Sequence, residues 1–155
     1  LWLYKSNIWS IQNLCKEAEK RNINSNRLIF ANKLPLDKHL ARHSLGDLGL
    51  DTFNYNGHTT TSDALWAGLP VLTKAGNSFA ARVSASLLTS LGIPELITYN
   101  EKEYEEQALL LANNPEILNK LKSKVIYLRN KSPLFNSKLY TNNLEFIFNK
   151  LIKSI

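Results

Sequence analysis

Cysteine and methionine are almost missing from this sequence of 155 residues, which has one cysteine and no methionine. A single thiol cannot form an internal disulfide, and it excludes a zinc site built from several cysteines. Long apolar runs are missing as well, since none approaches the roughly 20 residues that a membrane-spanning helix needs. No secretory signal is recognisable at the start of the chain. We therefore expect a cytoplasmic protein that does not contact a membrane.

Several motifs of nucleotide and hydrolase chemistry are also missing. The sequence contains no GxGxxG, no GxxxxGK[ST] and no GxSxG, which are typical of dinucleotide-binding proteins, P-loop proteins and α/β-hydrolases. It has three histidines, without a neighbouring cluster of carboxylates and without an Asp-x-Asp pair. We therefore expect neither a catalytic metal nor a bound cofactor.

Acidic residues are fewer than basic ones, so the formal charge is +6 and the isoelectric point is about 9.4. The lysines are scattered along the chain, and no dense basic run with interleaved aromatic residues occurs. Such scattering argues against nucleic-acid binding, for which a basic patch or stripe is typical. A basic surface suits small anionic ligands equally well.

Short apolar runs alternate with helical patterns of apolar residues over the first two thirds of the chain. The predicted strands are residues 1–4, 27–31, 48–51, 70–73 and 95–98, and the predicted helices are residues 7–21, 36–43, 60–67 and 79–91. Later patterns are helical only, at residues 101–113, 115–130 and 137 to near the end. Alternation with short connections predicts an α/β fold with a parallel sheet covered on both faces.

We interpret residues 1–155 as one Rossmann-like, doubly wound domain with a helical tail over residues 101–155. The chain begins abruptly with a strand pattern and without methionine, so we expect a fragment of a longer protein. Its three tryptophans lie in strand or helix patterns. We expect Trp2, Trp9 and Trp66 to pack in the core.

The stretch Asn56-Gly-His-Thr-Thr60 is the strongest candidate for a binding site. Ligands of parallel sheets bind beyond the carboxyl ends of strands, and this stretch lies between a predicted strand and a predicted helix. Asn-Gly would allow a sharp turn with positive φ. The N–H groups of the helix start and the helix dipole then favour an anion such as a diphosphate. The alternative is simple N-capping by Thr59 or Thr60.

Three further polar residues are candidates with two interpretations each. Asp63 lies one turn into the predicted helix, where it could accept hydrogen bonds from two vicinal sugar hydroxyls or could only complement the helix dipole. His39 and Arg42 are three positions apart on one helical face. They could stack on a heterocycle and donate to its carbonyl groups, or they could be solvated surface residues.

Five segments resemble the protein O-linked N-acetylglucosamine transferases, and specifically the C-terminal half of their catalytic region. They are Asn56–Thr60, Asp63, Leu65–Pro70, Ala81–Ser86 and Ser132–Asn136, and the resemblance runs from Leu1 to about Phe148. The resemblance implies a GT-B fold of two Rossmann-like domains, of which this chain would be the donor-binding one. It also implies metal-independent, inverting transfer of N-acetylglucosamine from UDP-GlcNAc to serine or threonine hydroxyls of proteins.

The resemblance further implies roles for particular residues. His58, Thr59 and Thr60 would contact the diphosphate, and Asp63 would contact the ribose. His39 would pack against uracil, while Arg42 and the backbone of Leu34 would read the edge of the base. Acceptor proteins would bind upstream regions, which in the family usually include tetratricopeptide repeats.

Two departures from the family pattern leave alternatives open. Leu36 stands where the family has a lysine near the ribose. The family's diphosphate-binding lysine, a nearby glutamine and the first strand and helix of this sheet would precede the chain, and the general base cannot be named from it. No catalytic residue is therefore assigned, and the isolated fragment is expected to be inactive. Alternatives are a related transferase that uses another UDP-hexose or GDP-fucose, and a non-catalytic module that binds a nucleotide sugar.

Overall fold

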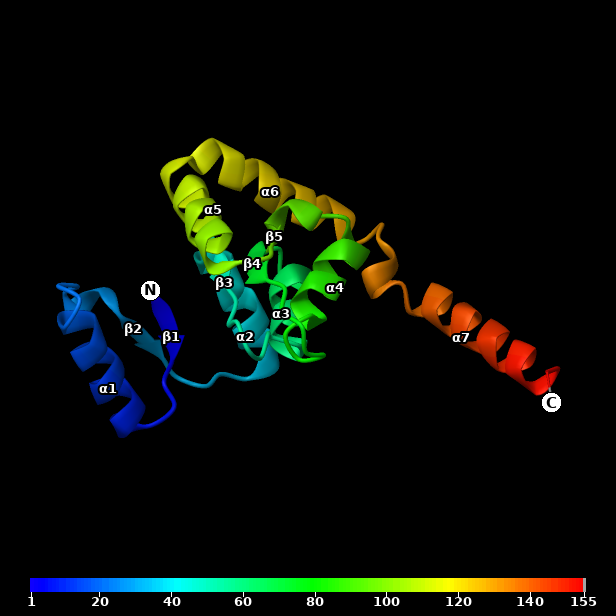
Figure 1. Ribbon diagram of the computed structural model, residues 1–155, viewed down its shortest axis with the longest axis horizontal. Coiled ribbons are helices and arrows are strands. Elements are labelled where there is room, and N and C mark those ends of the chain that lie inside the picture. Colours follow the sequence, from blue (N-terminus) through cyan, green and yellow to red (C-terminus); the bar gives the residue numbers. More distant parts are fainter. Residues whose placement is uncertain (155) are drawn as a thin grey trace. The chain divides into compact units, whose positions relative to one another are not determined.

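The computed structural model describes residues 1–154 and contains helices and parallel strands (Figure 1). The chain forms two compact units, which divide between His39 and Leu40. Every strand pair within the described residues is parallel. The predicted α/β class with parallel pairing is therefore confirmed.

The first unit contains one pair of strands joined by a helix. β1 (Trp2–Tyr4) pairs with β2 (Ile29–Ala31), and the connection contains α1 (Ile8–Glu19) and the short 3-10 helix η1 (Ser25–Arg27). α1 begins with a capping box, in which Asn7 Oδ1 accepts from the Ser10 N–H at 2.8 Å and Ser10 Oγ accepts from the Asn7 N–H at 3.4 Å. Such reciprocal bonds satisfy two N–H groups that would otherwise lack partners at the helix start.

The second unit contains a three-stranded sheet in the order β3-β4-β5. The strands are β3 (Gly49–Leu50), β4 (Val71–Lys74) and β5 (Ile97–Thr98). Val71, Leu72 and Thr73 of the central strand are all buried. A strand covered on both faces must be apolar at consecutive positions, which explains why the sequence shows a continuous run there and no alternation.

Helices of different lengths complete the chain. α2 (Leu36–Arg42) contains the boundary between the two units. The remaining helices are α3 (Thr59–Trp66), α4 (Val83–Leu91), α5 (Glu101–Asn113), α6 (Pro115–Leu128) and α7 (Ser137–Ile152), with 3-10 turns η2 (His43–Leu45), η3 (Pro94–Leu96) and η4 (Pro133–Phe135). α7 contains no buried residue.

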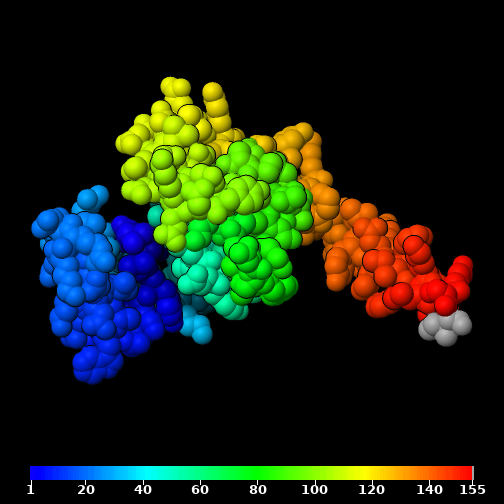
Figure 2. Space-filling view, in the orientation of Figure 1, coloured from blue at the N-terminus to red at the C-terminus, as the bar shows by residue number. Residues whose placement is uncertain are grey.

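The core of the second unit is apolar and continuous. α3, β4, α4, α5 and α6 each contribute to it, with Leu65, Leu72, Leu88, Leu111 and Val125 all fully buried. In the space-filling view, the green to yellow residues of these segments lie in close contact (Figure 2). The packed core fixes the sheet and the helices on which the candidate site is built.

The predicted helix stops are confirmed at two glycines. Gly68 follows α3 with φ +91°, and Gly92 follows α4 with φ +92°. In this left-handed region a side chain is strained, whereas glycine is not. α4 nevertheless starts at Val83, four residues later than predicted, because residues before it form a turn in which Arg82 N–H bonds to Phe79 O at 3.1 Å.

The expectation that the tryptophans lie in the core is wrong. Trp2, Trp9 and Trp66 are 40%, 71% and 44% exposed. Trp9 lies on α1 of a unit of only 39 residues, and so small a unit cannot bury many large side chains. Trp66 packs edge-on against Phe135, with ring centroids 5.1 Å apart, and the Arg129 guanidinium carbon lies 5.7 Å from the centroid of its ring.

Candidate functional site

The loop between β3 and α3 contains most of the residues that the sequence singles out. It starts at Asp51, directly after the carboxyl end of β3, and ends at His58, the N-cap of α3. The carboxyl ends of parallel strands are where ligands of open α/β sheets bind. The loop therefore has the place in the fold that the sequence predicts for it.

Asp51 holds this loop together through its carboxylate. Oδ1 accepts from the N–H of Gly57 at 2.7 Å and from the N–H of Thr52 at 2.9 Å, and Oδ2 accepts from Thr73 Oγ1 at 2.6 Å. Asn56 adds a bond from Nδ2 to Thr52 O at 2.7 Å. The sequence gives one weak signal for this role, since the predicted third strand ends on an aspartate.

α3 begins without a side-chain cap. Its N-cap residue is His58, with φ −99° and ψ −89°, and no side chain bonds to the first-turn N–H groups. The alternative of N-capping by Thr59 or Thr60 is therefore wrong. The N–H groups of the first turn have no intrahelical carbonyl to bond to, and the turn contains no acidic residue. This helix end can therefore donate to an anion.

Gly57 is required for a different reason from the predicted one. The expected positive φ is wrong, because the only positive-φ glycines in the described residues are Gly68 and Gly92. A Cβ at position 57 would instead lie 2.7 Å from Thr60 Oγ1 and closer still to Thr61 Oγ1. Glycine is needed here because the first turn of α3 packs directly against its backbone.

His58 is held between two aromatic rings that sequence reasoning did not single out. Its imidazole stacks on Tyr55 with centroids 4.8 Å apart and an interplanar angle of 12°, and Phe79 meets it edge-on at 6.0 Å. His58 Nε2 is buried and has no hydrogen-bond partner within residues 1–154. A buried polar nitrogen without a partner is uncommon in folded proteins, and it can be satisfied by a ligand.

The structure places four predicted residues in one continuous stretch. His58, Thr59 and Thr60 form the start of α3, with the two threonines exposed, and the half-buried Asp63 follows one turn later. Thr61 is buried and turned toward α4, where its Oγ1 lies 2.9 Å from Ser84 Oγ. The hydroxyl of Thr61 is therefore used within the protein, unlike those of its two exposed neighbours.

The other three predicted residues lie around the division between the units. Leu34 and His39 belong to the first unit, and Arg42 belongs to the second. α2 carries both His39 and Arg42, three positions apart as predicted. Their contact with a base remains a prediction.

Lys74 is the basic residue at the carboxyl end of β4. Its Nζ forms an ion pair with Glu101 at 3.2 Å and lies 4.3 Å from the centroid of the Phe53 ring. The ammonium is thus occupied by an acid and an aromatic face. The loop that follows is closed by a bond from Gly76 N–H to Ala81 O at 2.8 Å.

Tyr104 of α5 supports the loop from the other side. Its hydroxyl donates to the backbone carbonyl of Asp51 at 3.1 Å. Burial, together with the nearby Asp51 charge, raises the pKa of Tyr104 to about 12. The phenol therefore stays protonated and remains a donor well above its ordinary range.

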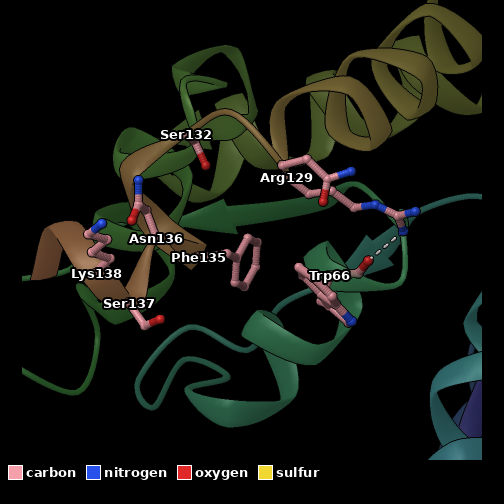
Figure 3. Close-up of a pocket in the computed structure, with 8 residues that line it drawn as sticks. Trp66, Arg129, Ser132, Phe135, Asn136, Ser137 and Lys138 are labelled. Carbon is pink, nitrogen blue, oxygen red and sulfur yellow. Dashed lines mark hydrogen bonds between the residues drawn. The ribbon is translucent and has the colours of Figure 1, made fainter.

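A hollow of about 270 Å³ lies at the C-terminal end of α3 (Figure 3). Trp66, Phe135 and Arg129 line it, and Arg129 Nη1 donates to the Trp66 carbonyl at 2.8 Å. The Oγ of Ser132 and the Nε of Arg129 are buried without a partner in the described part of the chain. Sequence reasoning predicted no site here.

Residues 1–154 contain neither a metal-binding cluster nor a membrane-spanning helix. No three His, Cys, Asp or Glu side chains are grouped so that they could hold a metal ion. Among the same residues, no helix is both long enough and apolar enough to cross a membrane.

Three comparisons relate the chain to known proteins. The family model described as "Glycosyl transferase family 41" matches residues 1–144. The chain is 34% identical over 153 residues to the UDP-N-acetylglucosamine--peptide N-acetylglucosaminyltransferase of Caenorhabditis elegans, which covers 99% of this chain and 13% of the relative. It is 39% identical over 113 residues to a probable enzyme of the same name, SPINDLY, from Solanum lycopersicum, covering 73% of this chain and 12% of that one.

A solved structure of an O-GlcNAc transferase mutant from Thermobaculum terrenum has the same fold. The TM-score is 0.89 with 29% sequence identity, over 97% of this chain and 29% of the other. The chain thus spans less than a third of each of these relatives. The family match nevertheless extends over nearly all of its length, and the chain belongs to glycosyl transferase family 41.

Proposed function

We propose that the parent protein is an inverting glycosyltransferase that moves N-acetylglucosamine from UDP-GlcNAc to serine or threonine hydroxyls of proteins, and that this chain is its donor-binding part. The observation that carries the proposal is the uncapped N-terminus of α3 beside the unsatisfied Nε2 of His58. The names of the relatives from Caenorhabditis elegans and Solanum lycopersicum support the choice of donor and acceptor.

The start of α3 would bind the diphosphate without a metal. The N–H groups of its first turn and the exposed hydroxyls of Thr59 and Thr60 are hydrogen-bond donors, and the unpartnered Nε2 of His58 would be another in the tautomer that is protonated there. The helix dipole adds a partial positive charge at the same place. Bonds from such donors to a charged group contribute about 1.5–3 kcal/mol each, so a few of them are sufficient to orient the leaving group.

Catalysis by this part of the protein would consist in stabilising the leaving group. The acceptor hydroxyl attacks the anomeric carbon from the face opposite the diphosphate, and the bond from that carbon to the diphosphate oxygen breaks. The hydroxyl proton passes to a base that the described residues do not identify. Negative charge grows on the diphosphate during this step, and donors fixed in advance stabilise it more in the transition state than in the ground state.

The remaining predicted residues would hold the nucleoside. Asp63 would accept from ribose hydroxyls, His39 would pack on uracil, and Arg42 with the backbone of Leu34 would contact the edge of the base. Acceptor proteins would bind regions of the parent outside this chain. The proposal includes a cytoplasmic setting, no cofactor, and no nucleic acid or membrane as partner.

Calorimetric titration of the 155-residue chain with UDP, GDP and NAD tests the donor assignment. We expect UDP to bind best, and Thr59→Ala, Asp63→Ala and His39→Ala each to weaken its binding by about tenfold, the equivalent of 1.4 kcal/mol. Thr141→Ala is the matched control, because it removes a threonine hydroxyl from the exposed helix α7. A circular dichroism melt of each variant separates lost binding from lost folding.

Other outcomes would change the proposal in defined ways. A preference for GDP would point to a fucosyl-type donor, and a cooperative fold that ignores every nucleotide would refute the site assignment. Transfer activity of the parent protein, measured with UDP-GlcNAc and an acceptor peptide, separates an enzyme from a binding module. We expect the isolated chain to bind the donor without turning it over.

A further inference from the structure

The backbone of Gly57 is bonded on both sides to side chains from other parts of the second unit. Its N–H donates to Asp51 Oδ1 at 2.7 Å, and its carbonyl accepts from Ser84 Oγ at 2.9 Å. Asp51 follows β3, and Ser84 lies in the first turn of α4. One residue of the loop is thereby tied to two separate elements immediately before α3 begins.

Ser84 and Asp51 are themselves held in place by further hydrogen bonds. Ser84 is fully buried, and its Oγ also lies 2.9 Å from Thr61 Oγ1 in the first turn of α3. The second carboxylate oxygen of Asp51 accepts from Thr73 of β4, and its backbone carbonyl accepts from Tyr104. Because Asp51 and Ser84 are bonded to further groups, the loop cannot rotate without breaking several buried or partly buried hydrogen bonds.

The geometry of the peptide bond carries this restraint to His58. The carbonyl of Gly57 and the N–H of His58 belong to one peptide plane, and no cis peptide occurs in the described residues. In a trans peptide the two groups point in opposite directions. The bond from Ser84 to the Gly57 carbonyl therefore fixes the direction of the His58 N–H, which points away from Ser84 within the peptide plane.

The negative charge of Asp51 would weaken the binding of a diphosphate nearby, so its presence in this loop needs a structural reason. A carboxylate within one loop of a diphosphate site repels the ligand and disfavours its binding. Its three bonds to Gly57, Thr52 and Thr73 give it a structural reason to be present. A carboxylate accepts two N–H donors on one oxygen and a hydroxyl on the other.

We propose that Asp51 and Ser84 are positioning residues, which fix the Gly57–His58 peptide and the entry to α3 so that its donors meet the diphosphate. This inference rests on the proposed function, because it assumes that a diphosphate binds there. The two residues act through Gly57 and His58 and do not touch the ligand. Substitutions of Asp51 or Ser84 should therefore weaken the binding of a nucleotide that carries a β-phosphate more than the binding of one that lacks it.

The test compares UDP with UMP, which lacks that phosphate, in titrations of the 155-residue chain. We expect Ser84→Ala and Asp51→Ala to lower the affinity for UDP by about tenfold while the affinity for UMP changes by less than about threefold. Asp51→Asn keeps an oxygen for the Gly57 N–H, so it should restore most of the UDP affinity. Ser86→Ala, an exposed position of the same helix, is the matched control.

The outcomes separate this inference from the proposed function. If the unmodified chain binds UDP no better than UMP, both fail. If it prefers UDP and Thr60→Ala removes that preference, but the Ser84 and Asp51 variants keep it, only the positioning inference fails. An equal loss of UDP and UMP affinity would indicate a general structural role and would also overturn it. If Asp51→Ala does not fold, Ser84→Ala alone decides, because it removes one hydroxyl, whereas Asp51→Ala leaves three donors without their acceptor.

Discussion

The N-termini of α3 and α5 belong to the same unit and are both rich in polar residues, but their donors are used differently. At α5, Asn100 Oδ1 accepts from the Glu103 N–H at 2.9 Å, and two glutamates occupy the first turn. At α3, no side chain caps the helix and no acid lies in the first turn. The cap of α5 satisfies its own helix, whereas the start of α3 keeps its donors available for a ligand.

The difference shows that polar composition alone does not identify a binding site. An asparagine in extended backbone conformation, as at Asn100 with φ −145° and ψ 168°, places its side chain against the first turn. His58 has a different backbone conformation, and Thr61 is bonded toward Ser84. Substitutions at the two helix ends should therefore have opposite consequences for stability and for binding.

Gly57→Ala should give the largest effect. The added Cβ would collide with the hydroxyls of Thr60 and Thr61, and overpacking of this kind costs about 1–3 kcal/mol of stability. We expect UDP affinity to fall by at least about tenfold as well, since the start of α3 must move. Gly46→Ala is the control, because a Cβ there would lie 3.3 Å from the end of the Leu69 side chain and 3.5 Å from the His43 carbonyl oxygen, without a severe overlap. Unchanged binding by the Gly57 variant would show that the close packing is unimportant.

Thr60→Ala should separate binding from stability at the α3 end. Its exposed hydroxyl makes no cap bond, so the free energy of unfolding should change by less than about 0.5 kcal/mol. UDP affinity should nevertheless fall by about tenfold. Thr89→Ala, which removes a hydroxyl bonded to Ala85 O on α4, should leave UDP affinity as it is. A loss of stability with unchanged affinity would reverse our interpretation of this helix end.

Asn100→Ala should show the opposite behaviour at the α5 end. Loss of the cap is expected to cost about 1 kcal/mol of stability, while UDP binding should be unaffected. Urea denaturation and calorimetry measure the two quantities on the same sample. Weaker UDP binding would mean that the two helix ends are not independent.

Tyr104→Phe should give the smallest effect on binding; besides the loss of its hydrogen bond to the Asp51 carbonyl, it should change how stability depends on pH in alkaline solution. The pKa of Tyr104 is raised from 10 to about 12. Because the folded-state pKa is higher, the stabilisation is fully present below pH 10 and is lost as the pH rises from 10 to 12. The phenylalanine variant should lack this part of the decline when unfolding is measured at pH 9, 10 and 11. Parallel curves for the two proteins would contradict the assignment.

Local signals predicted much of the secondary structure. Pro115 begins α6 in the first-turn position that proline tolerates, and Gly92 ends α4 in the left-handed conformation. Each of these depends on one residue and its nearest neighbours. The predicted start of α4 was wrong because residues 79–82 continue the helical pattern of the sequence but form a separate turn before the helix.

The candidate site was only partly predictable from the sequence. The exposed threonines and His58 stand together along the chain, so spacing was sufficient to single them out. Asp51 and Phe79 were not assigned a role, because their contacts join positions that are distant in sequence. Thr73 lies 22 positions from Asp51, for example, and is bonded to it.

The sequence by itself determined the order of strands and helices, the glycine stops and the polar stretch before α3, because each depends on backbone preferences over a few residues. Only the tertiary structure decided that this stretch remains uncapped, that His58 lies between Tyr55 and Phe79, and that Gly57 is bonded to Ser84 from 27 positions away. The reason is physical: whether a donor is satisfied depends on which groups the packed core brings beside it, and no local preference specifies those groups.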